Sequence, residues 1–259
     1  MDLPLRVSAA QEGEADFGPL TVLFRRRASG VDYAVCRRDT EQERTDGPRP
    51  DVLWRRYVGD SSSEVLQLSL ALPDLPVVVT PDVPVYVAAG AEVELFALIP
   101  GVLALSFLAP DHTQVLPPLE EIPIIELGRT WLGSAAEGRL CYSLSSSLEE
   151  SAPRPLPEEW DGRIVSPLRI RNTAGAAARI QKLVVLSPQL SLLQESDGTL
   201  TTNATLNVLQ KDGEMSFALG RERLKDKAGR RVLGRPRNPD EDSWWKRGID
   251  LIQRISSYN

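Results

Sequence analysis

Residues 79–105 have the sequence VTPDVPVYVAAGAEVELFALIPGVLAL, and residues 165–193 have a similar one, VSPLRIRNTAGAAARIQKLVVLSPQLSLL. Each stretch begins with alternating aliphatic residues and passes through a small-residue turn, Ala89-Gly90-Ala91 or Ala174-Gly175-Ala176. Each then continues into a second apolar segment that a proline interrupts. Alternation with a period of two is typical of half-buried strands. The two stretches therefore predict two related β units that arose by internal duplication.

The same alternation extends over most of the first 210 residues. Turn sequences such as Ser29-Gly30, Asp197-Gly198 and Asp212-Gly213 lie beside the apolar segments, as tight hairpins require. Many short strands joined by such turns are typical of β-sandwiches and barrels. The sequence therefore predicts a mainly antiparallel β protein with two tandem, sandwich-like lobes. The clearest alternating positions are Leu20, Val22, Phe24, Leu66, Leu68, Leu70, Val93, Leu95 and Ala97.

Composition changes along the chain predict three parts. A proline-rich segment, residues 110–123, lies between the two similar stretches and indicates a boundary near residue 118. We expect a first β lobe over residues 1–118, a second over 119–220, and a basic arm with a C-terminal helix over 221–259. The helix is predicted because Trp245, Ile249 and Ile252 are spaced at i, i+4 and i+7.

Charge and composition exclude several classes of protein. The chain has 30 Lys and Arg residues against 36 Asp and Glu, a formal charge of −6, which disfavours a protein that wraps nucleic acid. We find neither a secretory signal nor an apolar stretch long enough to span a membrane, so we expect a soluble, cytoplasmic protein. In that compartment Cys36 and Cys141 are expected to be unpaired thiols.

The sequence contains no recognisable catalytic or cofactor motif. One histidine, His112, and two distant cysteines cannot assemble a common zinc site, so we expect no metal and no cofactor. Gly-x-Ser-x-Gly, Gly-x-Gly-x-x-Gly and P-loop sequences do not occur. These observations favour a non-enzymatic protein.

Tryptophans and carboxylates near loops offer one candidate ligand site. Trp131 and Trp160, with Glu158 and Glu159, can stack on and hydrogen-bond a carbohydrate or another small polar ligand. Trp54 also lies near a predicted strand end. The alternative is that these tryptophans anchor the core, as large aromatic residues usually do.

The C-terminal part offers a second candidate site, for a protein partner or for self-association. Residues 221–237 contain eight basic residues against two acids, and a helix with exposed apolar residues follows them. The alternative is an arm that lies on the acidic body of the chain itself. The residues that we expect at a partner contact are Arg230, Arg231, Arg235, Trp244 and Trp245.

Several short motifs also resemble a family described as a domain of unknown function, found in archaea and some bacteria. The resemblance covers roughly residues 17–220 and implies a β scaffold without transferring any catalytic residue. It rests on Thr130-Trp131-Leu132-Gly133, Gly138-Arg139-Leu140-Cys141-Tyr142-Ser143-Leu144, Ile164-Val165-Ser166-Pro167 and Ile170-Arg171-Asn172, followed by the apolar segment from Leu183 to Leu193.

Overall fold

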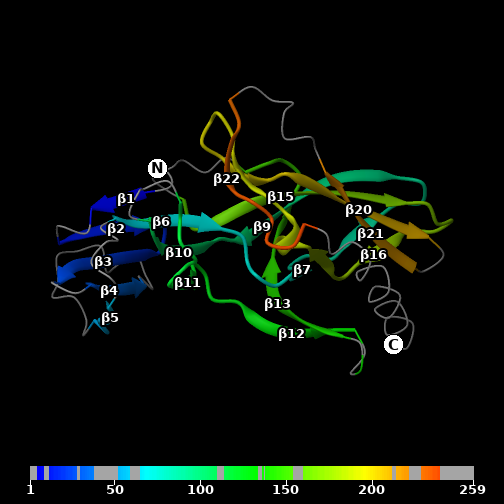
Figure 1. Ribbon diagram of the computed structural model, residues 1–259. Coiled ribbons are helices and arrows are strands. Elements are labelled where there is room, and N and C mark those ends of the chain that lie inside the picture. Colours follow the sequence, from blue (N-terminus) through cyan, green and yellow to red (C-terminus); the bar gives the residue numbers. More distant parts are fainter. Residues whose placement is uncertain are drawn as a thin grey trace. The chain divides into compact units, whose positions relative to one another are not determined.

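The fold is described by a computed structural model (Figure 1) that covers residues 5–8, 12–27, 30–37, 52–58, 65–109, 114–133, 136, 138–153, 160–211, 214–221 and 229–239. Strands dominate these residues, and the one helical element among them is a short 3₁₀ turn, η3 (Ser187–Gln189). The prediction of a mainly β protein is confirmed. The predicted C-terminal helix lies outside the described residues.

The chain forms two compact units, and each is built from separate chain segments. Unit 1 contains residues 1–71, 101–125 and 156–162, and unit 2 contains residues 72–100, 126–155 and 163–259. The units are therefore interleaved along the chain. The boundaries predicted from the sequence, at residues 118 and 220, separate parts of the chain that are expected to fold independently. This expectation stays a prediction.

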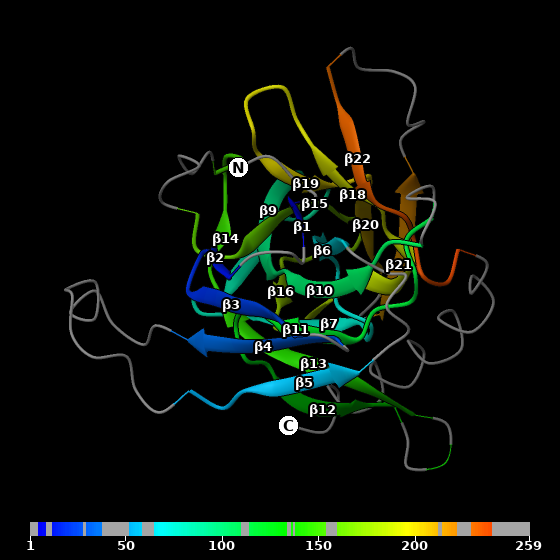
Figure 2. The same cartoon turned by 60° about the vertical axis from the view of Figure 1, so that its left-hand side comes forward.

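Unit 1 consists of two four-stranded antiparallel sheets (Figure 2), with strand orders β1-β6-β10-β11 and β2-β3-β4-β5. The strands of the first sheet are β1 (Leu5–Ser8), β6 (Val65–Ala71), β10 (Val102–Phe107) and β11 (Glu120–Pro123). Those of the second are β2 (Gly13–Phe17), β3 (Leu20–Arg27), β4 (Gly30–Arg37) and β5 (Arg55–Val58).

The two sheets of unit 1 share a core. The rings of Tyr57 on β5 and Phe107 on β10 contact each other with centroids 5.0 Å apart. Tyr33 on β4 donates a hydrogen bond from its hydroxyl to Glu120 Oε2 on β11, at 2.9 Å. Directly paired residues share a sheet face, so these contacts identify the inner faces. The inner faces carry the alternating residues predicted from the sequence, and Leu20, Val22, Phe24, Leu66, Leu68 and Leu70 are all buried.

Unit 2 contains three sheets, which the structure assigns as β12-β13-β7-β17, β16-β8 and an eight-stranded sheet. The first two use β7 (Val77–Pro81), β8 (Val85–Val87), β12 (Gly128–Leu132), β13 (Arg139–Ser146), β16 (Ala178–Ile180) and β17 (Leu183–Val185). The largest contains β9 (Glu92–Pro100), β14 (Leu148–Glu149), β15 (Arg163–Asn172), β18 (Leu192–Gln194), β19 (Leu200–Thr202), β20 (Ala204–Lys211), β21 (Glu214–Arg221) and β22 (Arg231–Gly234).

The two similar stretches of sequence meet within unit 2. Strand β8 pairs with β16, and β9 pairs with β15, so the strand before the turn in each stretch pairs with the strand after the turn in the other. Their small-residue turns adjoin at Asn172, which is fully buried. Its Nδ2 donates hydrogen bonds to the carbonyl oxygens of Val87, Ala88 and Ala176 at 2.8–3.1 Å. One asparagine therefore holds both turns together.

Part of the predicted basic arm belongs to a sheet. Strand β22 begins with Arg231, continues with Val232 and Leu233, and pairs with β18. Arg237 donates hydrogen bonds from its guanidinium group to the carbonyl oxygen of Leu72, at 3.1 and 3.3 Å. The described end of the arm is therefore extended and lies on the chain itself. Among all the residues that the structure describes, no helix is long and apolar enough to cross a membrane.

Candidate functional site

Four charged side chains from three adjacent strands meet on one face of the β2-β3-β4-β5 sheet. Arg25 on β3 pairs directly with Asp32 on β4, and Asp32 pairs in turn with Arg56 on β5. Arg27 lies two residues farther along β3 and therefore on the same face. Because Tyr33 and Tyr57 contact the other sheet of unit 1, this face is the one turned away from it. We call Arg25, Arg27 and Arg56 the guanidinium cluster.

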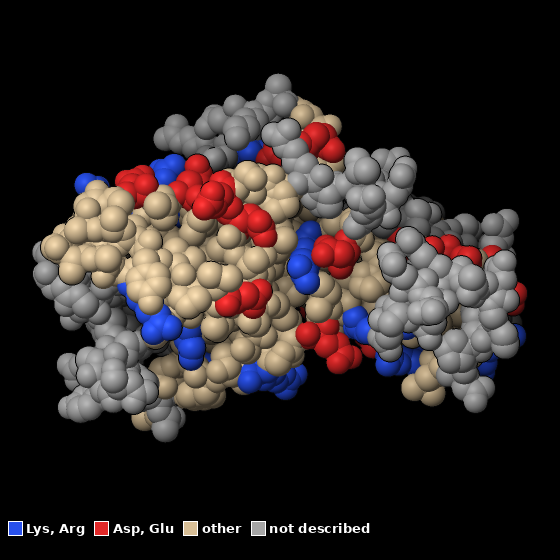
Figure 3. All heavy atoms as spheres, turned by 180° about the vertical axis from the view of Figure 1, so that it is seen from behind, with Lys and Arg blue, Asp and Glu red and all other residues tan. Residues whose placement is uncertain are grey.

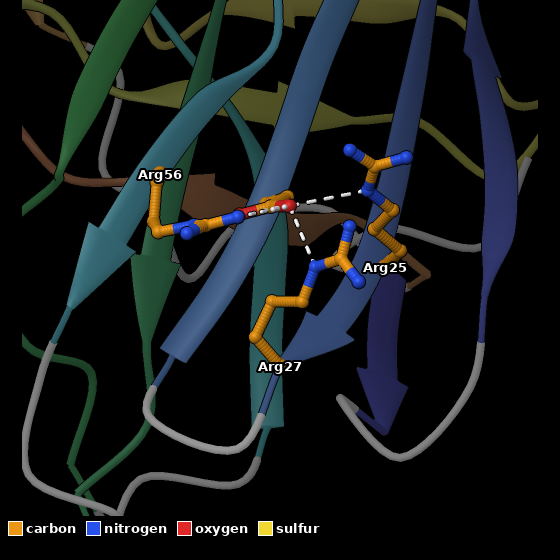
Figure 4. A network of polar contacts seen from close by, with 4 residues as sticks. Arg25, Arg27 and Arg56 are labelled. Atoms are coloured by element: carbon orange, nitrogen blue, oxygen red, sulfur yellow. Dashed lines mark hydrogen bonds and ion pairs between the residues drawn. The ribbon is translucent and has the colours of Figure 1, made fainter.

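All three arginines bind the one carboxylate (Figure 4). Arg25 Nε and Arg27 Nε lie 3.1 Å and 2.8 Å from Asp32 Oδ2. Arg56 approaches from the opposite strand, with Nε 2.7 Å from Oδ1 and Nη2 3.2 Å from Oδ2. The Asp32 side chain is only 3% exposed, whereas those of Arg25, Arg27 and Arg56 are 30%, 44% and 59% exposed. The carboxylate is thus enclosed, and the guanidinium groups reach solvent.

The charges of this group do not change near neutral pH. Hydrogen bonds from Arg56 and Arg27 hold the pKa of the Asp32 carboxyl well below its usual range, although burial acts in the opposite direction. Asp32 in turn raises the pKa of Arg56. Together, the three guanidinium groups and the one carboxylate carry a fixed formal charge of +2.

A cavity of about 370 Å³ opens beside the cluster on the same sheet. The guanidinium group of Arg25 lies over the indole ring of Trp54, 3.9 Å from its centroid, and both residues line the cavity. The other lining residues are Glu12, Gly13, Glu14, Leu23 and Phe24. The cavity therefore has carboxylates, an apolar wall and a stacked guanidinium group.

This arrangement is suited to binding and not to proton transfer. Asp32 stays ionised because its pKa is lowered, and arginine stays protonated, so neither group can act as a general acid or base near neutral pH. Within the described ranges, no three His, Cys, Asp or Glu side chains come together as a metal site would require. What the cluster provides is several fixed hydrogen-bond donors with positive charge.

The ligand-site residues predicted from the sequence are distributed over the chain. Trp131 on β12 is 52% exposed and belongs to unit 2, opposite Leu140 on β13. Trp160 is half-buried and belongs to unit 1. Glu158 and Glu159 lie outside the described residues. The site predicted from these four residues therefore stays a prediction.

The predicted partner-contact residues are described only in part. Arg230 is largely buried, and its Nη2 lies 2.6 Å from Glu195 Oε1. Arg231 and Arg235 are exposed. Trp244 and Trp245 lie outside the described residues, so their predicted role is untested.

The guanidinium cluster was not predicted from the sequence, although part of its signal is visible there. Arg25-Arg26-Arg27 and Asp32 flank the predicted Ser29-Gly30 turn. A two-residue turn at that position would pair Arg27 with Asp32, whereas the structure pairs Arg25 with Asp32 because β4 already begins at Gly30. Both cysteines are free thiols, as predicted, with Cys36 on this sheet and Cys141 buried in unit 2.

Comparison with known proteins agrees with the resemblance seen in the sequence. The family model described as "Protein of unknown function (DUF432)" matches residues 5–252. Neither the curated proteins nor the solved structures contain a match. The match spans both units and includes every residue of the guanidinium cluster. The chain therefore belongs to the DUF432 family of proteins of unknown function.

Proposed function

We propose that this protein is a non-enzymatic binding module whose guanidinium cluster binds a short acidic segment of a partner protein. The observation that carries the proposal is the convergence of Arg25, Arg27 and Arg56 on the single carboxylate of Asp32. One arginine is enough to neutralise one carboxylate. The two further arginines leave a positive charge that an acidic ligand can neutralise.

Asp32 orients the arginines without using all of their donors. It accepts a hydrogen bond from the Nε atom of each arginine, and from one Nη atom of Arg56. Among the described residues, the Nη atoms of Arg25 and Arg27 make no hydrogen bond. Figure 4 shows that Arg25 contacts the carboxylate through its Nε atom. Donors held in this way lose little conformational entropy when they bind a ligand carboxylate.

The surroundings of the cluster favour a short acidic segment over a long polyanion. Glu14 and Asp16 on β2 pair with Leu23 and Thr21, and so lie on the same face as the cluster. They limit the positive region to strands β3–β5. Among the side chains described on the face in Figure 3, acidic and basic residues form separate groups, and the basic ones make no continuous track. With a formal charge of −6, the whole chain repels an extended polyanion.

The proposal is tested by measuring the fluorescence anisotropy of a labelled five-residue acidic peptide titrated with the whole protein. Arg27→Gln removes one guanidinium group and leaves Asp32 bound by two others, and we expect binding about fivefold weaker. Arg169→Gln is the matched control, because Arg169 is a half-exposed arginine paired with Glu92 on a sheet of unit 2. Equal affinity of the two variants for the peptide contradicts the proposal.

Three further proposals come from the sequence. The pairing of β8 with β16 and of β9 with β15 supports an internal duplication of the two similar stretches. The C-terminal segment, with Trp244 and Trp245, is proposed as a second contact, either for a protein partner or for another copy of the chain. Removal of residues 240–259 should then lower the number of chains per particle measured by light scattering, and an unchanged number contradicts self-association through this segment. The third proposal is that the protein is cytoplasmic.

A further inference from the structure

The cavity beside the guanidinium cluster has carboxylates and a guanidinium group among its lining residues. Glu12 and Glu14 contribute the carboxylates, and Arg25 is shared between the cavity and the cluster. A ligand that occupies both places therefore meets negative charge in the cavity and positive charge beside it.

Local packing shapes this cavity. A Cβ atom on Gly13 would lie 2.5 Å from Phe24 Cζ, so only glycine lets the Phe24 ring lie against β2 at this point. Glu12 and Glu14 flank that glycine. Arg25 is held by its hydrogen bond to Asp32 and by stacking on Trp54. The cationic wall is therefore fixed in place before a ligand arrives.

We propose that the cavity binds a lysine or arginine side chain of the same acidic segment, next to the residues that the guanidinium cluster holds. This inference rests on the proposed function and extends it to a dipolar recognition sequence. A cationic side chain has an aliphatic stem that packs against Leu23 and Trp54, and a charged end that pairs with Glu12 or Glu14. The volume of about 370 Å³ is ample for one such side chain and lies within the usual range of ligand cavities. Because Arg25 belongs to both places, the basic and acidic residues of the partner must be adjacent or nearly so.

The probes are three five-residue peptides with blocked termini: Lys-Glu-Glu-Asp-Glu, its reversed sequence, and the same peptide with glutamine in place of lysine. We expect wild-type protein to bind one of the two lysine peptides about fivefold more tightly than the glutamine peptide, the gain typical of one favourable ion pair. In Glu12→Gln/Glu14→Gln this preference should disappear or reverse, because the cluster then repels the lysine. The control is Glu92→Gln/Glu94→Gln, which removes two exposed glutamates with the same i, i+2 spacing from β9 and should keep the preference.

Failure of this inference is distinguishable from failure of the proposed function. If Arg27→Gln weakens every peptide but wild-type protein binds the lysine and glutamine peptides equally, the dipolar site is contradicted and the acidic site stands. Retention of the preference in Glu12→Gln/Glu14→Gln also overturns the inference. If Arg27→Gln weakens none of the three peptides, both proposals are contradicted.

Discussion

Replacing Asn172 with alanine should be among the most destabilising single changes in unit 2. The side chain lies between the turns that follow β8 and β15, and it is fully buried. Its Oδ1 atom also accepts a hydrogen bond from the backbone N–H of Ala174, at 3.0 Å. Alanine removes these bonds and leaves buried backbone groups without their partner.

The size of the effect follows from the number of hydrogen bonds. Nδ2 has two hydrogens to share among three carbonyl oxygens, and Oδ1 accepts one bond, so about three full hydrogen bonds are lost. At about 1 kcal/mol each, the free energy of unfolding should fall by about 3 kcal/mol. For a chain of this size the melting temperature should fall by about 6–12 °C. Asn203→Ala is the control, because Asn203 is also buried but accepts one hydrogen bond, from the Ser191 N–H at 2.7 Å, and should cost about 1 kcal/mol.

The assay is urea and thermal unfolding of wild type, Asn172→Ala and Asn203→Ala, followed by circular dichroism in the β-sheet band. We expect the order wild type, Asn203→Ala, Asn172→Ala in decreasing stability. An Asn172→Ala variant that is no less stable than Asn203→Ala would refute the view that one asparagine holds both turns.

Three further predictions concern acid sensitivity, thiol reactivity and one glycine. The lowered pKa of Asp32 means that its contribution to stability is present above the carboxyl pKa of the unfolded chain, about 4, and is lost as the pH falls below it. The urea midpoint should therefore fall more steeply between pH 6 and pH 3 in wild type than in Asp32→Asn, and parallel curves contradict this role. Cys141 is buried and its pKa is raised to about 11, whereas Cys36 is partly exposed. A maleimide at pH 7.5 should therefore label Cys36 first, as followed by mass spectrometry. Equal labelling rates for the two thiols contradict the burial of Cys141. Gly162 has φ of +92° and its added Cβ would lie 2.2 Å from Ile124 Cγ2, so Gly162→Ala should lower the melting temperature by at least about 2–8 °C. Gly175→Ala meets no atom within 4 Å and is the control, and equal melting temperatures would contradict that steric reason.

Local sequence patterns were enough to predict much of the fold, because alternation and turn chemistry depend on neighbouring residues. Leu66, Leu68 and Leu70 lie in one strand and are buried. The Asp197-Gly198 turn joins β18 to β19, as expected of a hairpin. Strand β9 ends at Pro100, as expected of a proline, but Pro167 lies inside β15. On one side of β15 the neighbouring strand changes there from β19 to β20, whereas on the other side the pairing with β9 continues through Pro167 and Phe96.

The candidate site was less predictable because it depends on pairing between distant segments. The hairpin that brings arginines of β3 close to Asp32 can be inferred from the sequence, but the predicted Ser29-Gly30 turn would pair Arg27, and not Arg25, with Asp32. Arg56 is different, because residues 38–54 separate β4 from β5 and their length carries no information about register. Trp54 is ambiguous in the sequence between a core residue and a ligand contact, and its stacking with Arg25 is visible only in three dimensions.

The most direct test of the central claim is a calorimetric titration of the Lys-Glu-Glu-Asp-Glu peptide and its reversed sequence into wild type, Arg27→Gln and Arg169→Gln, each at 20 mM and 500 mM NaCl. Screening shortens the reach of exposed charges from more than 20 Å to about 4 Å over this range. We predict that wild type and Arg169→Gln bind one of the peptides at low salt, that Arg27→Gln binds it about fivefold more weakly, and that high salt weakens binding in all three. Binding of equal strength in wild type and Arg27→Gln, or binding that does not change with salt, would contradict a guanidinium site for an acidic partner.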